Sequence, residues 1–278
     1  MYRLKEKVAL ITLDADGLAE AVAIAFGQEG ATVVIAGKGE QQLAMVSKAV
    51  GAMGAECLPV AITPTDPASC ERMTAQIMEK YGKLDILCNL AGEFPLTEPL
   101  HKISVDDFHR MVEVNTKSVF LVSRFAVPAI RQNSGVGSII NLSHSAALNG
   151  VPGTSLLAAT KGALINLTRD MAMQGQKEGF RANCVCVGST FVPVVPSLMD
   201  EHKQNRVSAE ELAPTFVYLA SDDSLPMQGH ILTVDDGMNA WRDDSQRARI
   251  AEMEASNAQP GEEASEAAYG YLHGQVAL

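Results

Sequence analysis

Short apolar runs alternate with longer stretches of helical periodicity over most of the chain. The apolar runs cover residues 7–12, 32–36, 56–61, 84–90, 137–142, 182–187 and 230–235. The helical stretches cover residues 17–29, 39–53, 67–81, 104–132, 155–178 and 208–220. Runs that are apolar on both faces are typical of strands covered by helices on both sides of a sheet. The alternation therefore predicts an α/β fold with a doubly wound, seven-stranded parallel sheet, in a single domain over residues 1–242.

The C-terminal segment 243–278 has a different composition. It carries two arginines against seven acidic residues, and Pro260-Gly261 divides it into two pieces. Its end is apolar again, with Tyr269, Tyr271 and Leu272 close together. One interpretation is a frayed terminus, and the other is an arm that docks its aromatic end on a neighbour. Both interpretations stay open at this point.

Charge and composition exclude several classes of partner and of site. The formal net charge is −11, and the 278 residues contain no cluster of lysine and arginine, so we expect no nucleic acid and no anionic membrane surface as a partner. No targeting segment is visible, and no apolar run approaches the ~18–20 residues of a membrane span. The five cysteines have neither disulfide-framework nor metal-ligand spacing. They predict reduced thiols in a cytoplasmic protein without a metal site.

Six motifs occur in a fixed order along these elements. They are Thr12–Ala19, Asn89–Gly92, Asn115, the segment ending at Lys161, Asn183–Gly188 and Val234–Gly237. Together they resemble the short-chain dehydrogenase/reductase family over about residues 1–240. The resemblance implies a Rossmann-like fold in which a nicotinamide dinucleotide lies at a helix N-terminus beside a glycine-rich turn. It also implies hydride chemistry on an alcohol or a carbonyl.

The phosphate-binding turn departs from the family pattern T-G-x-x-x-G-x-G. Of its three glycines only Gly17 is present, and Leu13 occupies the first glycine position. Asp14 and Asp16 place carboxylates where the phosphates of the ligand would bind. At ~6 Å and an effective dielectric constant of ~20, each like-charge pair costs roughly 3 kcal/mol. Asp16 could instead cap the following helix, so we expect a self-capped helix and no dinucleotide in this chain.

Other cofactor positions of the family are partly retained. Asn89 and Gly92 match the motif after the fourth strand, and with Gly17 they are interpreted as relics of a cofactor site. NAD users of the family end the second strand with an acidic residue, whereas this chain has Lys38. Lys38 is either a solvated lysine or, as an alternative, a partner for the 2′-phosphate of NADP.

The catalytic motif is also incomplete. The family uses a tyrosine whose pKa is lowered by a lysine in Y-x-x-x-K, together with a serine and an asparagine. Lys161 and Asn115 match their positions, but the tyrosine position holds Leu157 and the serine position holds His144. Leucine cannot exchange a proton at any pH. His144 is either a hydrogen-bonded structural residue or a substitute acid or base.

This pattern of losses predicts a catalytically degenerate subunit without its own NAD(P). It resembles the nucleotide-free subunit of heteromeric members of the family that act on hydroxyacyl-CoA substrates. An intact paralogue would supply NAD, and the two chains would associate through the helices at 104–132 and 155–178, in a tetramer.

Two other functions remain possible on the sequence. One is an active NAD(P)-dependent oxidoreductase with a non-standard site, which would use His144 or a tail tyrosine, with NADPH at Lys38 as an alternative cofactor. The other is a cofactor-free lyase or hydratase built on His144, Asn115 and Lys161. Binding of NAD(P)H to the purified chain separates these hypotheses.

Overall fold

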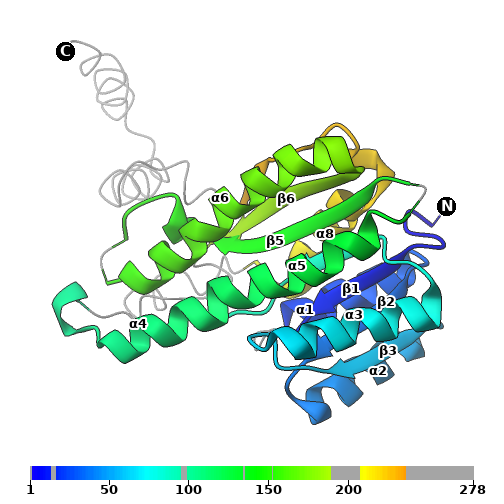
Figure 1. Cartoon of the computed structure of the whole chain (residues 1–278), viewed down its shortest axis with the longest axis horizontal. Helices are drawn as coiled ribbons and strands as arrows, with labels where there is room; N and C mark the ends of the chain where they lie inside the picture. The colour runs from blue at the N-terminus through cyan, green and yellow to red at the C-terminus, as the bar shows by residue number, and fades with distance from the viewer. Residues whose placement is uncertain are drawn as a thin grey trace, which may run out of the picture. The chain divides into compact units, whose positions relative to one another are not determined.

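The fold is a seven-stranded parallel sheet with helices on both faces, as the sequence predicts (Figure 1). The computed structural model describes residues 2–13, 17–94, 99–133, 135–151, 153–188 and 207–235. The strands are β1 (Val8–Thr12), β2 (Thr32–Gly37), β3 (Cys57–Ala61), β4 (Ile86–Asn89), β5 (Gly137–His144), β6 (Phe180–Val187) and β7 (Ile231–Val234). Their order across the sheet is β3-β2-β1-β4-β5-β6-β7, and every neighbouring pair is parallel.

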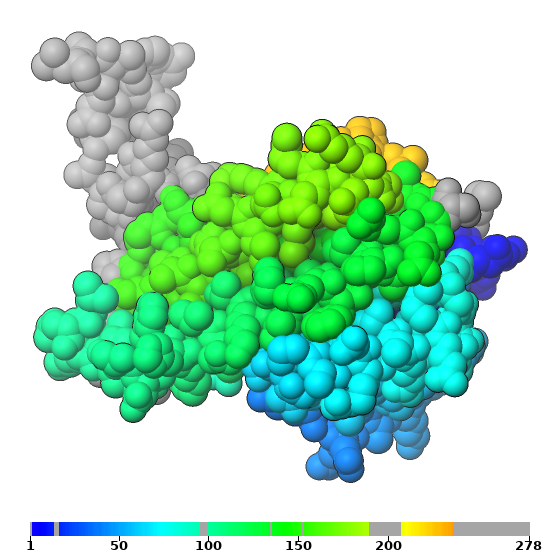
Figure 2. Space-filling model, viewed as in Figure 1, coloured from blue at the N-terminus to red at the C-terminus, as the bar shows by residue number. Residues whose placement is uncertain are grey.

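Helices bury both faces of this sheet. They are α1 (Leu18–Gln28), α2 (Glu40–Ala52), α3 (Pro67–Tyr81), α4 (Val105–Val112), α5 (Ser118–Ile130), α6 (Ser155–Glu178) and α8 (Ala209–Ala220). One core joins the sheet to α1, α2 and α8, and a second core joins the opposite face to α3, α5 and α6. Figure 2 shows the molecule from the side on which α3, α5 and α6 lie in front of the sheet. Burial on both faces explains why the strands read as continuous apolar runs.

Local sequence signals fix several helix ends. The side chain of Asp66 accepts the amide N–H groups of Ala68 and Ser69, and Pro67 follows it at the first helical position of α3. Ser208 and Glu211 form a reciprocal capping box at the start of α8. Such caps satisfy amide groups that have no partner inside the helix.

The stretch predicted as one helix over 104–132 contains an irregular turn. A π-helical turn, Glu113–Lys117, lies between α4 and α5. A π-turn inserts one extra residue into a helix, so the faces of α4 and α5 are offset from each other. Asn115 lies in this turn and is completely buried. Hydrophobic periodicity alone predicted the length of this helical segment but not the turn that positions Asn115.

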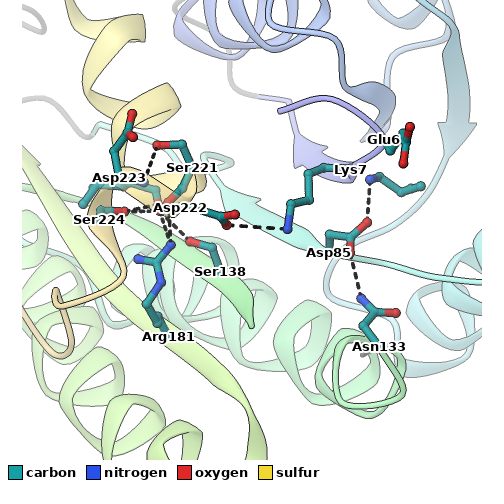
Figure 3. A network of polar contacts seen from close by, with 12 residues as sticks. Glu6, Lys7, Asp85, Asn133, Ser138, Arg181, Ser221, Asp222, Asp223 and Ser224 are labelled. Carbon is teal, nitrogen blue, oxygen red and sulfur yellow. Dashed lines mark hydrogen bonds and ion pairs between the residues drawn. The ribbon is translucent and has the colours of Figure 1, made fainter. Parts of the chain in front are cut away.

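A buried carboxylate ties three elements together at the amino edge of the sheet (Figure 3). Asp85, just before β4, accepts the backbone N–H of Val8 at 2.8 Å and the side-chain amide of Asn133 at 3.2 Å. Its other partner is Lys83, 3.2 Å away. This carboxylate therefore links the start of β1 to the end of α5.

A buried arginine lies at the same edge (Figure 3). Arg181 is 4% exposed, and it donates to the carbonyls of Leu219 and Ser221 at 2.9 Å and 3.1 Å. Ser138 also donates to the Leu219 carbonyl, at 2.8 Å. Burial lowers the pKa of the Arg181 guanidinium. A cation is well placed here because carbonyls at a helix C-terminus carry partial negative charge.

The chain divides into two units, Met1–Asp236 and Gly237–Leu278. The predicted arm at 243–278 lies outside the described residues, so it stays a prediction. All five cysteines are free thiols. Within the described ranges no helix is long and apolar enough to cross a membrane.

Candidate functional site

The candidate site lies at the carboxyl edge of the sheet, where the strand order reverses between β1 and β4. In open α/β sheets this switch point is where ligands bind. The hydroxyl of Thr12, at the end of β1, accepts the N–H groups of Leu90 and Ala91 at 2.9 Å and 3.0 Å. Asn89 donates to Ser123 at 3.0 Å and to Asn141 at 2.8 Å. The polar residues after β1 and β4 thus hold the rim of the site in place.

At Gly92 the side chains of Lys161 and Asn115 come close to the backbone. A Cβ at this position would lie 2.7 Å from Lys161 Nζ and 2.9 Å from Asn115 Oδ1. Any side chain here would push the lysine or the asparagine away. The glycine is therefore required by packing, and three residues from separate elements meet at one place.

Asn115 is held from two sides. Its Oδ1 accepts the N–H of Glu93 at 2.7 Å, and its Nδ2 donates to the Glu93 carbonyl at 2.9 Å. The same Nδ2 lies 3.2 Å from the hydroxyl of Thr160 in α6. The side chain therefore bridges the segment after β4 to α6.

Lys161 is completely buried at the floor of the site. Its Nζ lies 3.4 Å from the carbonyl oxygen of Leu142 and 5.3 Å from the ring centre of Phe94. The carbonyl contact ties the lysine to β5. The nearby Phe94 ring was not predicted.

His144 ends β5 and is completely buried. Its Nδ1 accepts the backbone N–H of Ala146 at 3.0 Å. Because an acceptor nitrogen carries no hydrogen, the neutral ring holds its proton on Nε2. The ring lies 5.8 Å from the Phe94 ring at an interplanar angle of 63°. His144 is thus both a hydrogen-bonded structural residue and an oriented donor.

Leu157 occupies an apolar part of the site. It is completely buried in α6 and packs with Ala146, Phe94 and Val151. No proton can be exchanged at this position. Among the described residues near Leu157, His144 and Lys161 carry groups that can take part in proton chemistry.

Two cysteines lie two residues apart in β6, on one face of the strand and close to the lysine. Both Cys184 and Cys186 are buried in β6. The hydrogen bond between the two thiols raises the pKa of Cys184 and lowers that of Cys186, and burial adds to the rise at Cys184. Lys161 favours the thiolate at both positions.

Among the described residues no group of His, Cys, Asp or Glu could hold a metal ion.

A crevice remains on the cofactor side of the site. A cavity of about 240 Å³ is lined by residues that follow β1, β2, β3 and β4, including Leu13, Lys38 and Gly92. Leu13 is only 8% exposed, and its Cβ lies 3.2 Å from the place that a Cβ on Gly37 would take. The bulk of Leu13 therefore fills space left by the glycine at the end of β2. Pockets for drug-sized ligands measure about 300–1,000 Å³, so this cavity suits one end of a dinucleotide.

The turn before α1 differs from the prediction. The N-cap residue is Gly17 and not Asp16, and Gly17 has φ of 82°. A Cβ on Gly17 would meet no atom of the described residues within 4 Å. Asp14 and Asp16 lie outside the described residues, and their predicted repulsion of phosphate cannot be placed. A glycine at a helix N-terminus fits a phosphate group.

The structure brings together most of the residues selected from the sequence. Gly92, Asn115 and Lys161 meet directly, and Phe94 links Lys161 to His144 and Leu157. Gly17 and Lys38 lie at the turns after β1 and β2, and Lys38 is exposed. Sequence reasoning missed Phe94, Glu93 and Thr160. The only signal for Phe94 was its place two residues after the matched Gly92.

Comparisons with known proteins agree with this placement. Residues 13–239 match a family described as enoyl-(acyl carrier protein) reductase. The 3-oxoacyl-[acyl-carrier-protein] reductase of Thermotoga maritima is 30% identical over 246 residues, 85% of this chain and 99% of that protein. Meso-2,3-butanediol dehydrogenase of Serratia marcescens is 32% identical over 247 residues, 86% of this chain and 96% of that protein.

Solved structures give the same result. Levodione reductase superposes with a TM-score of 0.78 at 25% identity, covering 86% of this chain and 99% of that one. A short-chain dehydrogenase/reductase from Burkholderia xenovorans gives a TM-score of 0.80 at 27% identity, covering 87% of this chain and all of that one.

These relatives correct the cofactor prediction. They are named as reductases and dehydrogenases, and hydride chemistry in this family uses NAD(P). The expectation that this chain has no dinucleotide of its own is therefore wrong, and the cofactor-free lyase or hydratase loses its basis. The physical reason is that Leu13 packs against Gly37, so its bulk does not close the crevice. By family match, identity and fold, the chain belongs to the short-chain dehydrogenase/reductase family.

Proposed function

We propose that this chain is an NAD(P)-dependent oxidoreductase with a non-standard proton site, acting on a carbonyl compound or the corresponding alcohol. The observation that carries the proposal is the meeting of Gly92, Asn115 and Lys161 at the carboxyl edge, beside the crevice. The names of its relatives support an oxidoreductase rather than a binding protein.

The chain offers specific groups for the dinucleotide. When bound, the cofactor supplies or accepts the hydride. The N-terminus of α1, next to Gly17, would hold its phosphates. Lys38 borders the cavity at the end of β2, and the one acidic residue among its described lining residues, Glu93, follows β4 instead. A cation at this place favours the 2′-phosphate, so NADPH is the expected form.

His144 and Lys161 would handle the substrate oxygen. The proton on His144 Nε2 makes the neutral ring a hydrogen-bond donor, suited to polarise a carbonyl as the family's serine would. The Lys161 ammonium stabilises negative charge on that oxygen, and it is the group that could release a proton to it. Asn115 holds the segment that carries Gly92 and Phe94.

Turnover of the purified chain tests this function. NADPH absorbance would be followed with a β-ketoacyl thioester and a vicinal diketone, the carbonyl classes suggested by the relatives. We expect turnover that falls at least about a hundredfold in Lys161→Met and about tenfold or more in His144→Phe. Lys48→Met, on α2, is the matched control. Binding of NADPH without turnover on any carbonyl would contradict the proposal.

A second candidate rests on Leu157. Its burial among apolar side chains leaves no proton-exchanging group at the tyrosine position. The chain could then bind NAD(P) and act as a structural or regulatory subunit of an intact paralogue. Phe120 on α5 and Met173 on α6 are 47% and 66% exposed, which would suit association through 104–132 and 155–178 in a tetramer. Residues 243–278 would serve as a docking arm in such an assembly.

A double variant separates the two candidates. His144→Ser with Leu157→Tyr rebuilds the family motif around Lys161 and Asn115. If the chain is a non-catalytic subunit, the double variant gains turnover of at least about tenfold, whereas the natural chain gains turnover only when an intact paralogue copurifies with it. If the chain is active by itself, the double variant loses the turnover that depends on His144.

A further inference from the structure

We propose that Phe94 is a positioning residue of this site, because one aromatic ring holds both the Lys161 ammonium and the His144 imidazole. Only the predicted effect of Phe94 on turnover rests on the proposed function. The contacts of Phe94 with Lys161 and His144 are present in the fold whether or not the chain is an enzyme.

Phe94 reaches the site from the segment that follows β4. It lies two residues after Gly92, where the chain passes beside Lys161 and Asn115. The ring is partly buried and packs with Ala146, Leu157 and Val151. The ring therefore lies between the apolar residues around Leu157 and the Lys161 ammonium.

The contact with Lys161 is electrostatic as well as apolar. Lys161 Nζ lies over the ring, 5.3 Å from its centre, and the lysine is completely buried. An ammonium group loses much of its hydration when it is buried. The negative face of an aromatic ring attracts such a cation more strongly in a desolvated site than at the surface.

The contact with His144 orients the second group. The two rings are 5.8 Å apart in an edge-to-face arrangement, with 63° between their planes. The Ala146 N–H already fixes the imidazole at Nδ1. With Phe94 as a second contact, the ring has little freedom to rotate, and its Nε2 is kept in one direction.

Phe94 also places an aromatic ring beside Lys161, where the family motif has the ring of a tyrosine. Leu157 is shorter than tyrosine and carries neither a ring nor a hydroxyl. The ring in contact with the lysine now comes from the β4 side, and it packs directly on Leu157. Phe94 thus takes the place of a missing aromatic neighbour, without the hydroxyl.

Ring fluorination separates this role from simple packing. Replacing Phe94 with 4-fluoro-, 3,5-difluoro- and 3,4,5-trifluorophenylalanine weakens the negative ring face stepwise with little change in volume. The unfolding equilibrium of the whole chain would be measured for each variant, in the natural background and in Lys161→Met. Phe26, buried in the α1 core, is the matched control for fluorination.

In the natural background we expect the folding equilibrium constant to fall stepwise, by about three- to tenfold at the trifluoro variant. In Lys161→Met and at Phe26 the series should be flat. An equal effect in both backgrounds, or no effect in either, would overturn the positioning role. This result does not depend on turnover, so it stands apart from the test of the oxidoreductase.

The catalytic consequence has its own measurement. If the natural chain turns over a carbonyl, the same fluorinated series should lower kcat stepwise while KM for NADPH stays constant. Phe94→Trp, which keeps an aromatic face, should retain more kcat than Phe94→Leu. A kcat that follows side-chain volume and not the ring face would contradict positioning through Lys161.

Discussion

The two edges of the sheet use buried polar groups for different purposes. At the amino edge, Asp85 and Arg181 tie backbone groups of neighbouring elements together (Figure 3). At the carboxyl edge, Thr12 and Asn115 make the same kind of contact, but the backbone groups that they hold belong to Ala91 and Glu93, which line an open crevice. The amino edge is therefore expected to contribute stability alone, and the carboxyl edge both stability and ligand binding.

This difference explains which motif residues the chain has. Thr12, Asn89, Asn115 and Lys161 all bond to the framework, so each has a structural role in addition to any chemistry. In the family motif the tyrosine and the serine act on substrate. Here those positions hold Leu157, which packs, and His144, which bonds to its own turn. The matching residues Thr12, Asn89, Asn115 and Lys161 thus hold the framework of the site together.

The largest expected effect is at the amino edge. Asp85→Ala removes the acceptor of the Val8 N–H and leaves a buried donor without a partner, which should lower the free energy of unfolding by about 2–3 kcal/mol. Urea denaturation measures this loss, and the Kd for NADPH should not change. Asp85→Asn, which keeps one acceptor oxygen, should lose less than half as much. A threefold change in Kd would break the division between the edges.

The next effect is at the carboxyl edge. In Gly92→Ala the new methyl group would stand 2.7 Å from Lys161 Nζ and 2.9 Å from Asn115 Oδ1, so both must move. We expect NADPH binding to weaken by about tenfold, roughly 1.4 kcal/mol, as measured by fluorescence titration.

Gly162→Ala is the control for that variant. It lies beside Lys161 in α6, and an added Cβ would meet nothing within 4 Å. Alanine there should raise helix stability by up to about 1 kcal/mol and leave Kd unchanged. If both alanine variants bind NADPH with the Kd of the natural chain, the short distances from Gly92 to Lys161 and Asn115 are not needed for cofactor binding.

The smallest effect concerns an exposed pair at the amino edge. Arg3 donates to the Glu29 carboxylate at 2.7 Å, and these hydrogen bonds lower the pKa of Glu29 below its ordinary 4.5. A lowered pKa in the folded state stabilises the protein above the unfolded pKa, and this contribution is lost as pH falls through the folded value. Glu29→Gln should therefore cost about 0.5 kcal/mol at neutral pH and nothing at pH values below both pKa values. A constant difference at every pH would exclude the charge as its cause.

Most of the fold followed from the sequence because it depends on local periodicity. All seven strands and the order of the helices were predicted, since strands buried on both faces are unmistakably apolar. The site followed only in part. The positions of Lys161 and Leu157 are set by spacing within one helix, but the contact between Phe94 and Lys161 joins two elements and leaves no trace in spacing.

The cofactor prediction was wrong for a related reason. The bulk of Leu13 and the charges of Asp14 and Asp16 were placed in the crevice by motif position. Packing of Leu13 depends on the absence of a side chain at Gly37, in a neighbouring strand. A sequence motif shows the larger side chain at position 13. It does not show that the neighbouring strand has a glycine that leaves room for it.

The π-turn at Glu113–Lys117 sets how α4 is rotated relative to α5. Because each residue of an α-helix turns the chain by about 100°, removing one residue from the turn would swing α4 around its axis while α5 stays anchored on the sheet. An insertion or deletion of one residue in this turn would therefore rotate mainly α4, the helix that precedes Asn115. The length of this turn therefore fixes which face of α4 is presented beside Asn115.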